Sequence, residues 1–313
     1  MTGIQVKSFI THKRGETDGD IQDSIAYDVD RGRYALSDGV TNSFLPKCLS
    51  DLLTQSYLEA EIQSDFPPQS LPQQFRTERD NYLQQLDAEQ MMLQEMVEEE
   101  FKVGAATFVG LTVDGDEFSW QVLGDSCLFL LPEDGHLRCF CSMPVRVNPD
   151  WSLDVQFGNH PRQIHSDGAV VGEWIKGKRT VTSGWVILAS DAMSNWMVQQ
   201  WNERRNFIPE LWALHGQDDF EAFVEQEYQA GRLKSDDESV ILIRIAEISD
   251  NSQTDEESVP TENSEFSQHF GNSDSSEDSE DSKSSDHYDH SEPSDDIESN
   301  TFDDDFDYSG FAQ

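Results

Sequence analysis

Four aspartates stand at the ends of apolar runs, and this placement indicates a site for hard metal ions. Asp38 follows the run YALS and Asp125 follows WQVLG, whereas Asp191 follows WVILAS and Asp236 lies just before SVILIRI. If these runs are strands of shared sheets, their ends can converge, and carboxylates that lie close together repel one another unless they are protonated or neutralised. Clusters of carboxylate oxygens suit Mg²⁺, Mn²⁺ or Ca²⁺. The sequence therefore predicts a divalent-metal site.

A plainer interpretation exists for each of these aspartates. An Asp before Gly, or directly after a strand, is common turn chemistry. Spacing along the chain does not show that four acids meet in space. From the residues alone we expect a soluble α+β protein with a divalent-metal site, and they identify no substrate.

The elements that must position these acids are short strands that pair locally. The dipeptides Arg31-Gly32, Asp114-Gly115 and Asp134-Gly135 each separate two strand-like runs, as in β-hairpins. The expected strands are Ser24–Asp30, Arg33–Ser37, Val103–Val113, Glu117–Leu123, Cys127–Leu131, Leu137–Cys141, Trp185–Ala189 and Ser239–Ile245.

The spacing of apolar residues predicts helices in two pairs. The first pair is Phe44–Ile62 and Gln73–Phe101, separated by prolines, and the second is Met193–Trp201 and Phe220–Ala230. Local strand pairing together with paired helices favours sheets packed on each other with helices outside, rather than a parallel βαβ array.

The charge balance disfavours several classes of partner. The 313 residues include 62 Asp or Glu against 21 Lys or Arg, for a formal net charge of -41. A nucleic-acid binder needs a basic footprint, and an anionic membrane surface would repel this chain. No stretch approaches the roughly 20 apolar residues of a membrane span, and the first residues lack the apolar core of a signal peptide. We therefore expect a cytoplasmic protein that binds neither nucleic acid nor membrane.

The four cysteines do not form a disulfide framework, because they are too few for so long a chain. Cys139 and Cys141 alternate with Phe140, so both thiols would point the same way on a strand. We interpret these two as packed thiols rather than as metal ligands.

The charge is also unevenly spread, and this predicts a domain boundary. Residues 250–313 hold 21 Asp or Glu and one basic residue, Lys283. Such a segment cannot bury enough apolar surface to offset the entropy of ordering it. We expect a folded domain over 1–249 and a disordered acidic tail over 250–313. The tail's last aromatics, from Phe302 to Phe311, suggest a docking motif for a basic partner. A merely solubilising tail, and self-inhibition of the metal site, are the alternatives.

At the same acidic residues, the chain resembles the metal-dependent type 2C Ser/Thr protein phosphatases, the PPM family, and looks most like its bacterial members. Each matching block is short, but their joint order across residues 12–245 is that of the family. The blocks are Ile21-Gln22-Asp23-Ser24, Ala35-Leu36-Ser37-Asp38-Gly39, Gly104-Ala105-Ala106-Thr107, Leu123-Gly124-Asp125-Ser126, Leu188-Ala189-Ser190-Asp191-Ala192 and Asp236-Asp237-Glu238-Ser239-Val240-Ile241-Leu242.

The resemblance implies a four-layer α-β-β-α sandwich, in which two central antiparallel sheets lie between helix pairs. It also implies a centre of two Mn²⁺ or Mg²⁺ ions, with a weaker third ion. Asp38 would bridge two ions and the Gly39 carbonyl would bind one of them, while Asp191 and Asp236 would hold the other. Asp125 would contribute, with Asp191, to the third site.

Two further residues take catalytic roles under the same resemblance. Asp23 would hold metal-bound water, and Arg14, with Lys13 beside it, would grip the substrate phosphate. A hydroxide bridging the two metals would attack the phosphorus of a phosphoserine or phosphothreonine in a protein substrate.

The chain departs from the family pattern after Gly39, where many relatives carry a His that protonates the leaving oxygen. Here Val40-Thr41-Asn42 follows, which leaves metal-bound water, His12 or His160 as the proton donor. This departure keeps a second function open: a pseudophosphatase or acidic-tailed module that binds phosphorylated or basic partners without turnover.

Overall fold

A computed structural model of the chain describes residues 2–61, 65–87, 90, 102–132, 135–158 and 162–247. The tail expected over 250–313 lies outside the described residues. So do His160 and residues 91–101, which make up much of the helix expected over Gln73–Phe101.

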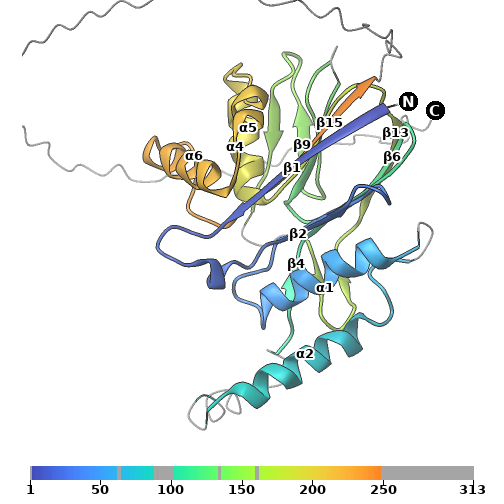
Figure 1. The fold of residues 1–313 in the computed structure, drawn as a ribbon, viewed down its shortest axis with the longest axis vertical. Coiled ribbons are helices and arrows are strands. Elements are labelled where there is room, and N and C mark those ends of the chain that lie inside the picture. The colour runs from blue at the N-terminus through green and yellow to red at the C-terminus, as the bar shows by residue number, and fades with distance from the viewer. Residues whose placement is uncertain are drawn as a thin grey trace, which may run out of the picture. The chain divides into compact units, whose positions relative to one another are not determined.

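The first of two five-stranded sheets has the strand order β1-β15-β14-β7-β8, and every pair of neighbours is antiparallel (Figure 1). β1 was not among the expected strands. It becomes a strand by pairing with β15 along its whole length, from Thr2 opposite Glu247 to Thr11 opposite Glu238. The bounds are β1 Thr2–Thr11, β7 Cys127–Leu131, β8 Arg138–Phe140, β14 Gly184–Ala189 and β15 Glu238–Glu247.

The second sheet has the order β13-β6-β5-β3-β2 and is also antiparallel throughout. Its central strands are the hairpins expected from the sequence, and β13 adds an edge strand that the sequence did not predict. The bounds are β2 Ser24–Asp28, β3 Arg33–Ser37, β5 Phe108–Asp114, β6 Glu117–Leu123 and β13 Ile175–Thr180.

Shorter strands form two small sheets that were not expected either. One is the pair β10-β9 and the other has the order β12-β11-β4. Two or three residues each are too few for a period-2 pattern to be visible. The bounds are β4 Ala105–Ala106, β9 Val145–Val147, β10 Leu153–Val155, β11 Gln163–His165 and β12 Val170–Val171.

The helices lie on the two sheets in separate groups. α1 packs on β2, β3 and β5 of the second sheet, with α2 against it, whereas α4 packs on β14 and β15 and α6 packs on β1 of the first sheet. α1 falls within the predicted helix Phe44–Ile62, whereas α4 extends beyond the predicted Met193–Trp201 at both ends, and α5 was not predicted. The bounds are η1 Asp18–Asp20, α1 Pro46–Glu59, α2 Leu71–Gln85, α4 Asp191–Asn202, α5 Ile208–Ala213 and α6 Gln217–Gln229.

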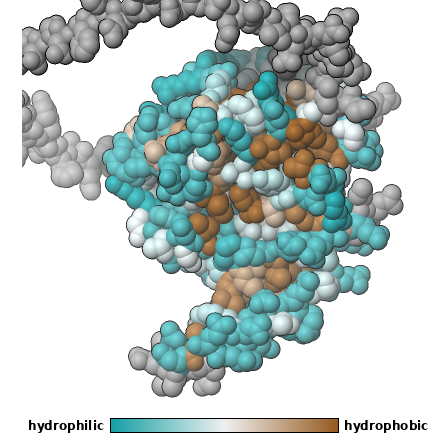
Figure 2. Space-filling view, in the orientation of Figure 1, coloured by the Kyte–Doolittle hydropathy of each residue, from teal (hydrophilic) through white to brown (hydrophobic). Residues whose placement is uncertain are grey.

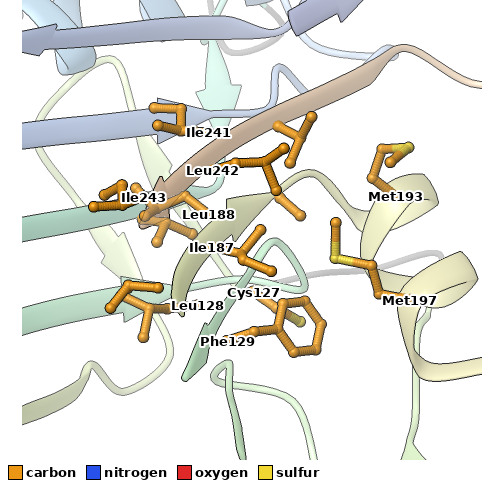
Figure 3. Packing of buried hydrophobic residues seen from close by; sticks show 14 of the residues in the cluster. Cys127, Leu128, Phe129, Ile187, Leu188, Met193, Met197, Ile241, Leu242 and Ile243 are labelled. Atoms are coloured by element: carbon orange, nitrogen blue, oxygen red, sulfur yellow. The ribbon is translucent and has the colours of Figure 1, made fainter. Parts of the chain in front are cut away.

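The alternation of side chains along β3 shows how the sheets share their core. Tyr34 and Leu36 belong to the cluster that includes the buried residues of the first sheet, whereas Ala35 between them packs with Leu49 of α1. Figure 3 shows the same division in the first sheet, where Ile187 lies toward α4. Successive side chains of β3 therefore pack in two different clusters, one that includes residues of the first sheet and one that includes α1.

The structure confirms the α+β class with antiparallel sheets, while the four-layer order as a whole stays a prediction. α2 buries Leu71 and Phe75, and Figure 2 shows its outer surface, at the bottom of the view, as largely hydrophilic. Among the described helices, none is both long and apolar enough to cross a bilayer.

Candidate metal centre

Strand register places Asp23 and Asp38 side by side at one end of the second sheet. Ser24, the first residue of β2, pairs with Ser37, the last residue of β3. Asp23 and Asp38 each lie one residue beyond this pair, so the antiparallel geometry brings the two carboxylates to the same end. Asp23 is 1% exposed.

The first sheet places two more acids by the same kind of pairing. Ala189 of β14 pairs with Cys127, the first residue of β7. Asp191 follows β14 by two residues and Asp125 precedes β7 by two, so both lie beyond the same end of the sheet. Asp191 is also the first residue of α4, and its Oδ1 accepts a hydrogen bond of 2.6 Å from the N–H of Ala192.

Asp236 reaches this end of the sheet from the loop before β15. The β15 residue Val240 pairs with Ala189, and the N–H of Ser190 donates to the carbonyl of Ser239 at 3.0 Å. The two segments therefore stay side by side beyond the last paired residues of the strands, and Asp236 lies toward Asp191.

A chain of hydrogen bonds joins the ends of the two sheets. The N–H of Thr107 donates to the Asp38 carbonyl at 2.8 Å, and the Thr107 hydroxyl lies 2.7 Å from the hydroxyl of Ser126. The Asp38 turn and the Gly124-Asp125-Ser126 turn are therefore tied through one threonine.

Two glycines make these turns possible. A Cβ on Gly39 would lie 2.8 Å from the carbonyl oxygen of Gln22 and from Cβ of Pro46, so no side chain fits between the chain segments. Gly124 has φ +112 and a Cβ there would lie 2.5 Å from Cβ of Thr107, a combination that only glycine accepts.

Burial and the charges of neighbouring acids raise the pKa of four of the five acids, Asp23, Asp38, Asp125 and Asp191. Burial, followed by the charge of Asp191, raises the pKa of Asp125 to about 7. Burial, followed by the charge of Asp236, raises the pKa of Asp191 to about 6. Burial, with the charges of Asp23, Asp191 and Asp125, raises the pKa of Asp38 well above its usual range. Such a cluster is costly unless cations neutralise it.

Buried oxygens without partners fit a set of hard-cation ligands. Oδ2 of Asp23 and Oδ1 of Asp125 are buried, and neither has a hydrogen-bond partner among the described residues. Buried carboxylate oxygens are normally hydrogen-bonded or metal-bound. The donor set is oxygen throughout, which suits Mn²⁺ or Mg²⁺.

The cluster is open rather than a tight cage. In the described part of the chain, three thiols have ligand atoms all within 4.8 Å of one another, but no three of the carboxylates do. Unneutralised carboxylates repel one another, and the described carboxylates lie farther apart than the ligand atoms of one closed site.

Lys13 brings a positive charge to this acidic site. Its Nζ lies 3.0 Å from Oδ1 of Asp236 and donates to the Thr41 hydroxyl at 3.1 Å. The Lys13 side chain is 17% exposed. Its pKa is raised, because the hydrogen bond and charges of Asp236, Asp237 and Glu16 outweigh the opposing effect of burial.

The side chains of Arg14 and His12 contact residues other than the five acids. The Arg14 guanidinium lies over the Tyr228 ring, 4.5 Å from its centroid, and 3.4 Å from Glu225 of α6. His12 directs Nε2 toward Asp18, at 3.9 Å.

Two further acids lie at the site, Asp237 and Glu238, although no role was predicted for either from the sequence. The carboxylate of Asp237 accepts hydrogen bonds from the N–H of Lys13 at 3.1 Å and of Gln22 at 2.7 Å, so it joins both ends of the loop between β1 and β2. Glu238 is 2% exposed, and burial raises its pKa to about 9. Both belong to the acidic run Asp236-Asp237-Glu238 at the start of β15, and this run is the sequence feature that could have indicated them.

The chain is similar in structure to several solved Ser/Thr phosphatases. One is the catalytic domain of PstP in complex with two manganese ions, which is 14% identical with a TM-score of 0.48 and covers 79% of this chain and 100% of that one. Another is the Mycobacterium tuberculosis phosphatase PstP/Ppp, at 16% identity and a TM-score of 0.46, covering 78% and 99%. A third is Stp1 from Staphylococcus aureus, at 14% and 0.48, covering 78% and 96%.

No family model matches the chain, and no curated protein matches it in sequence. At the identities and TM-scores above, the likeness gives no residue of this chain a role.

Proposed function

We propose that this chain is a metal-dependent phosphatase that hydrolyses phosphoserine and phosphothreonine in proteins. The observation that carries the proposal is the acidic cluster at the ends of both sheets, with its unpaired buried oxygens on Asp23 and Asp125. Carboxylates in such number need cations, and bound divalent ions would attract the dianionic phosphate of a phosphoprotein.

Asp38, the Gly39 carbonyl, Asp191 and Asp236 would hold two Mn²⁺ or Mg²⁺ ions, and Asp125 would help to hold a weaker third ion. Such ions supply positive charge for the phosphate oxygens and lower the pKa of water.

The chain's own groups position the reactants around these ions. Asp23 lies beside Asp38 with one free oxygen, which would accept a hydrogen bond from water and orient it. Lys13 would bind a substrate phosphate oxygen through Nζ, which lies 3.0 Å from Oδ1 of Asp236. We infer that Lys13, rather than Arg14, takes this role. Asp237 holds the loop that carries Lys13.

A second function, binding of phosphoproteins without turnover, is favoured by the positions of the histidines. Val40-Thr41-Asn42 stands directly after Gly39, without a His, and Nε2 of His12 lies 3.9 Å from Asp18. A phosphatase without a histidine at the leaving oxygen needs another proton donor.

The test is turnover of a phosphopeptide by the full chain with Mn²⁺, with EDTA, and as the Asp38→Asn variant. We expect turnover that needs metal and that falls by about two orders of magnitude or more in the variant. The matched control is Asp30→Asn, since Asp30 is exposed in the turn between β2 and β3, and its rate should be unchanged. Turnover that persists in EDTA contradicts the proposal, and metal-dependent binding without turnover favours the binding module.

A further inference from the structure

Three buried thiols form a second cluster of metal-ligating atoms in the first sheet. Cys127, Cys139 and Cys141 have Sγ atoms that all lie within 4.8 Å of one another. Their exposed fractions are 0%, 9% and 4%, and none is in a disulfide. This cluster is separate in chemistry from the acidic site, since all three ligand atoms are sulfur.

Strand register explains why the three sulfurs meet. Cys139 of β8 pairs with Phe129 of β7, and Phe140 pairs with Leu128. The next pair in this register, one residue beyond the strand end, sets Cys141 opposite Cys127. Side chains two apart lie on one face of a strand, so Cys139 and Cys141 both stand on the face that carries Cys127.

That face is turned toward α4 and is apolar. Figure 3 shows Cys127 and Phe129 on the side of the sheet where Met193 and Met197 of α4 lie. All of these residues belong to one buried hydrophobic cluster. The thiols are therefore shielded from water.

The number, spacing and type of these ligands define the ion they suit. Three sulfurs that share one ion at about 2.3 Å stand about 4 Å apart, which the spacing allows. Thiolates select soft ions over hard ones. The group includes no fourth His, Cys, Asp or Glu ligand among the described residues, whereas structural Zn²⁺ is almost always four-coordinate. A closed set of three sulfurs suits Cu(I) better.

We propose that Cys127, Cys139 and Cys141 form a three-coordinate thiolate site for one Cu(I) ion. A metal needs the thiolate form of each ligand, so an ion that binds here displaces the protons of all three thiols.

The site would be linked to the acidic centre through Cys127. The Cys127 thiol donates to the backbone carbonyl of Asp125 at 3.2 Å. A metal-bound thiolate has no proton to donate, so an ion here removes this hydrogen bond from the Asp125 turn. Copper binding and Mn²⁺ binding should therefore affect each other, although the copper site itself does not depend on the proposed phosphatase function.

The test is an anaerobic titration of the reduced full chain with Cu(I) in competition with a Cu(I)-specific colorimetric chelator. We expect one Cu(I) per chain, with X-ray absorption showing sulfur ligands only. Cys139→Ala and Cys141→Ser should each weaken binding by about two orders of magnitude or more. The matched control is Cys48→Ala, since Cys48 lies on α1 and outside the cluster, and its affinity should be unchanged.

Several outcomes would overturn the proposal. These are no copper retained against the chelator, equal affinity in Cys139→Ala, loss of binding in Cys48→Ala, or tighter binding of Zn²⁺ with an oxygen ligand. Thermal unfolding of each variant without metal identifies any that fail to fold. If Cys139→Ala does not fold, Cys141→Ser decides the question.

Discussion

The ammonium of Lys13 lies 3.0 Å from Oδ1 of Asp236, although the two residues are more than 200 positions apart in the chain. The contact exists because β1 and β15 are paired up to Thr11 and Glu238, which leaves Lys13 and Asp236 two residues beyond the paired ends. Lys13 is thereby held at the acidic centre, while its neighbour Arg14 turns toward α6.

This difference predicts that substitutions of two adjacent residues change KM by very different amounts. Lys13→Ala should raise KM for a phosphopeptide about tenfold or more, because a charge-assisted contact to phosphate is lost. Arg14→Ala should change KM less than about twofold, since its partners are Glu225 and Tyr228. Steady-state kinetics at saturating Mn²⁺ measure both. If Lys13→Ala also weakens Mn²⁺ binding, Lys13 supports the metal centre rather than the substrate.

The raised pKa values predict how the metal-free protein responds to pH. Asp191 at about 6, Asp125 at about 7 and Glu238 at about 9 all exceed their unfolded values. Groups with raised pKa favour the folded state below their unfolded pKa, and that contribution is lost as pH rises through the folded pKa. In EDTA, Tm should therefore fall between about pH 5 and pH 9.

Manganese should reverse this loss, and its stabilising effect should be larger at high pH, where the ligands are ionised. Asp125→Asn removes one of the raised carboxyl groups, so its metal-free Tm should fall less steeply with pH. Thermal unfolding with EDTA and with Mn²⁺ checks both expectations. An Mn²⁺ effect that does not vary with pH would contradict a ligand set of buried carboxylates.

The Gly124 turn should tolerate no side chain. Gly124→Ala combines a positive φ with a Cβ 2.5 Å from Thr107, and should lower the free energy of unfolding by about 2 kcal/mol or more. Gly115→Ala also has a positive φ, +63, but meets no atom within 4 Å, so it should cost about 1 kcal/mol. Urea denaturation of both variants separates crowding from backbone strain. Equal losses would show that Thr107 moves aside.

The domain boundary predicts that the tail is not needed for folding or chemistry. A chain of residues 1–249 should unfold at the same temperature as the full chain and hydrolyse a short phosphopeptide at a rate within about twofold. Binding of a basic partner protein should be lost. A faster truncated enzyme would instead indicate self-inhibition by the acidic segment.

Short-range sequence patterns predict many of the strands and helices, and the acids predict a hard-cation site. Hairpin turns such as Asp114-Gly115 and apolar runs such as WVILA are local signals that favour strands. The WVILA strand, β14, is completed by pairing with β7 and β15. The acids at the ends of these runs indicate hard cations, because carboxylate oxygens are the ligands that such ions prefer. A strand such as β1 could not be predicted in the same way, because its partner, β15, lies at the other end of the described chain.

Which side chains face one another depends on contacts between distant segments of the chain. Lys13 and Arg14 are adjacent and equally charged, and the direction of each depends on what β15 and α6 place beside it. Cys139 and Cys141 were expected on one face, but the arrival of Cys127 depends on the register between β7 and β8. Register and side-chain direction follow from packing between distant segments, and the spacing of residues along the chain does not encode them locally.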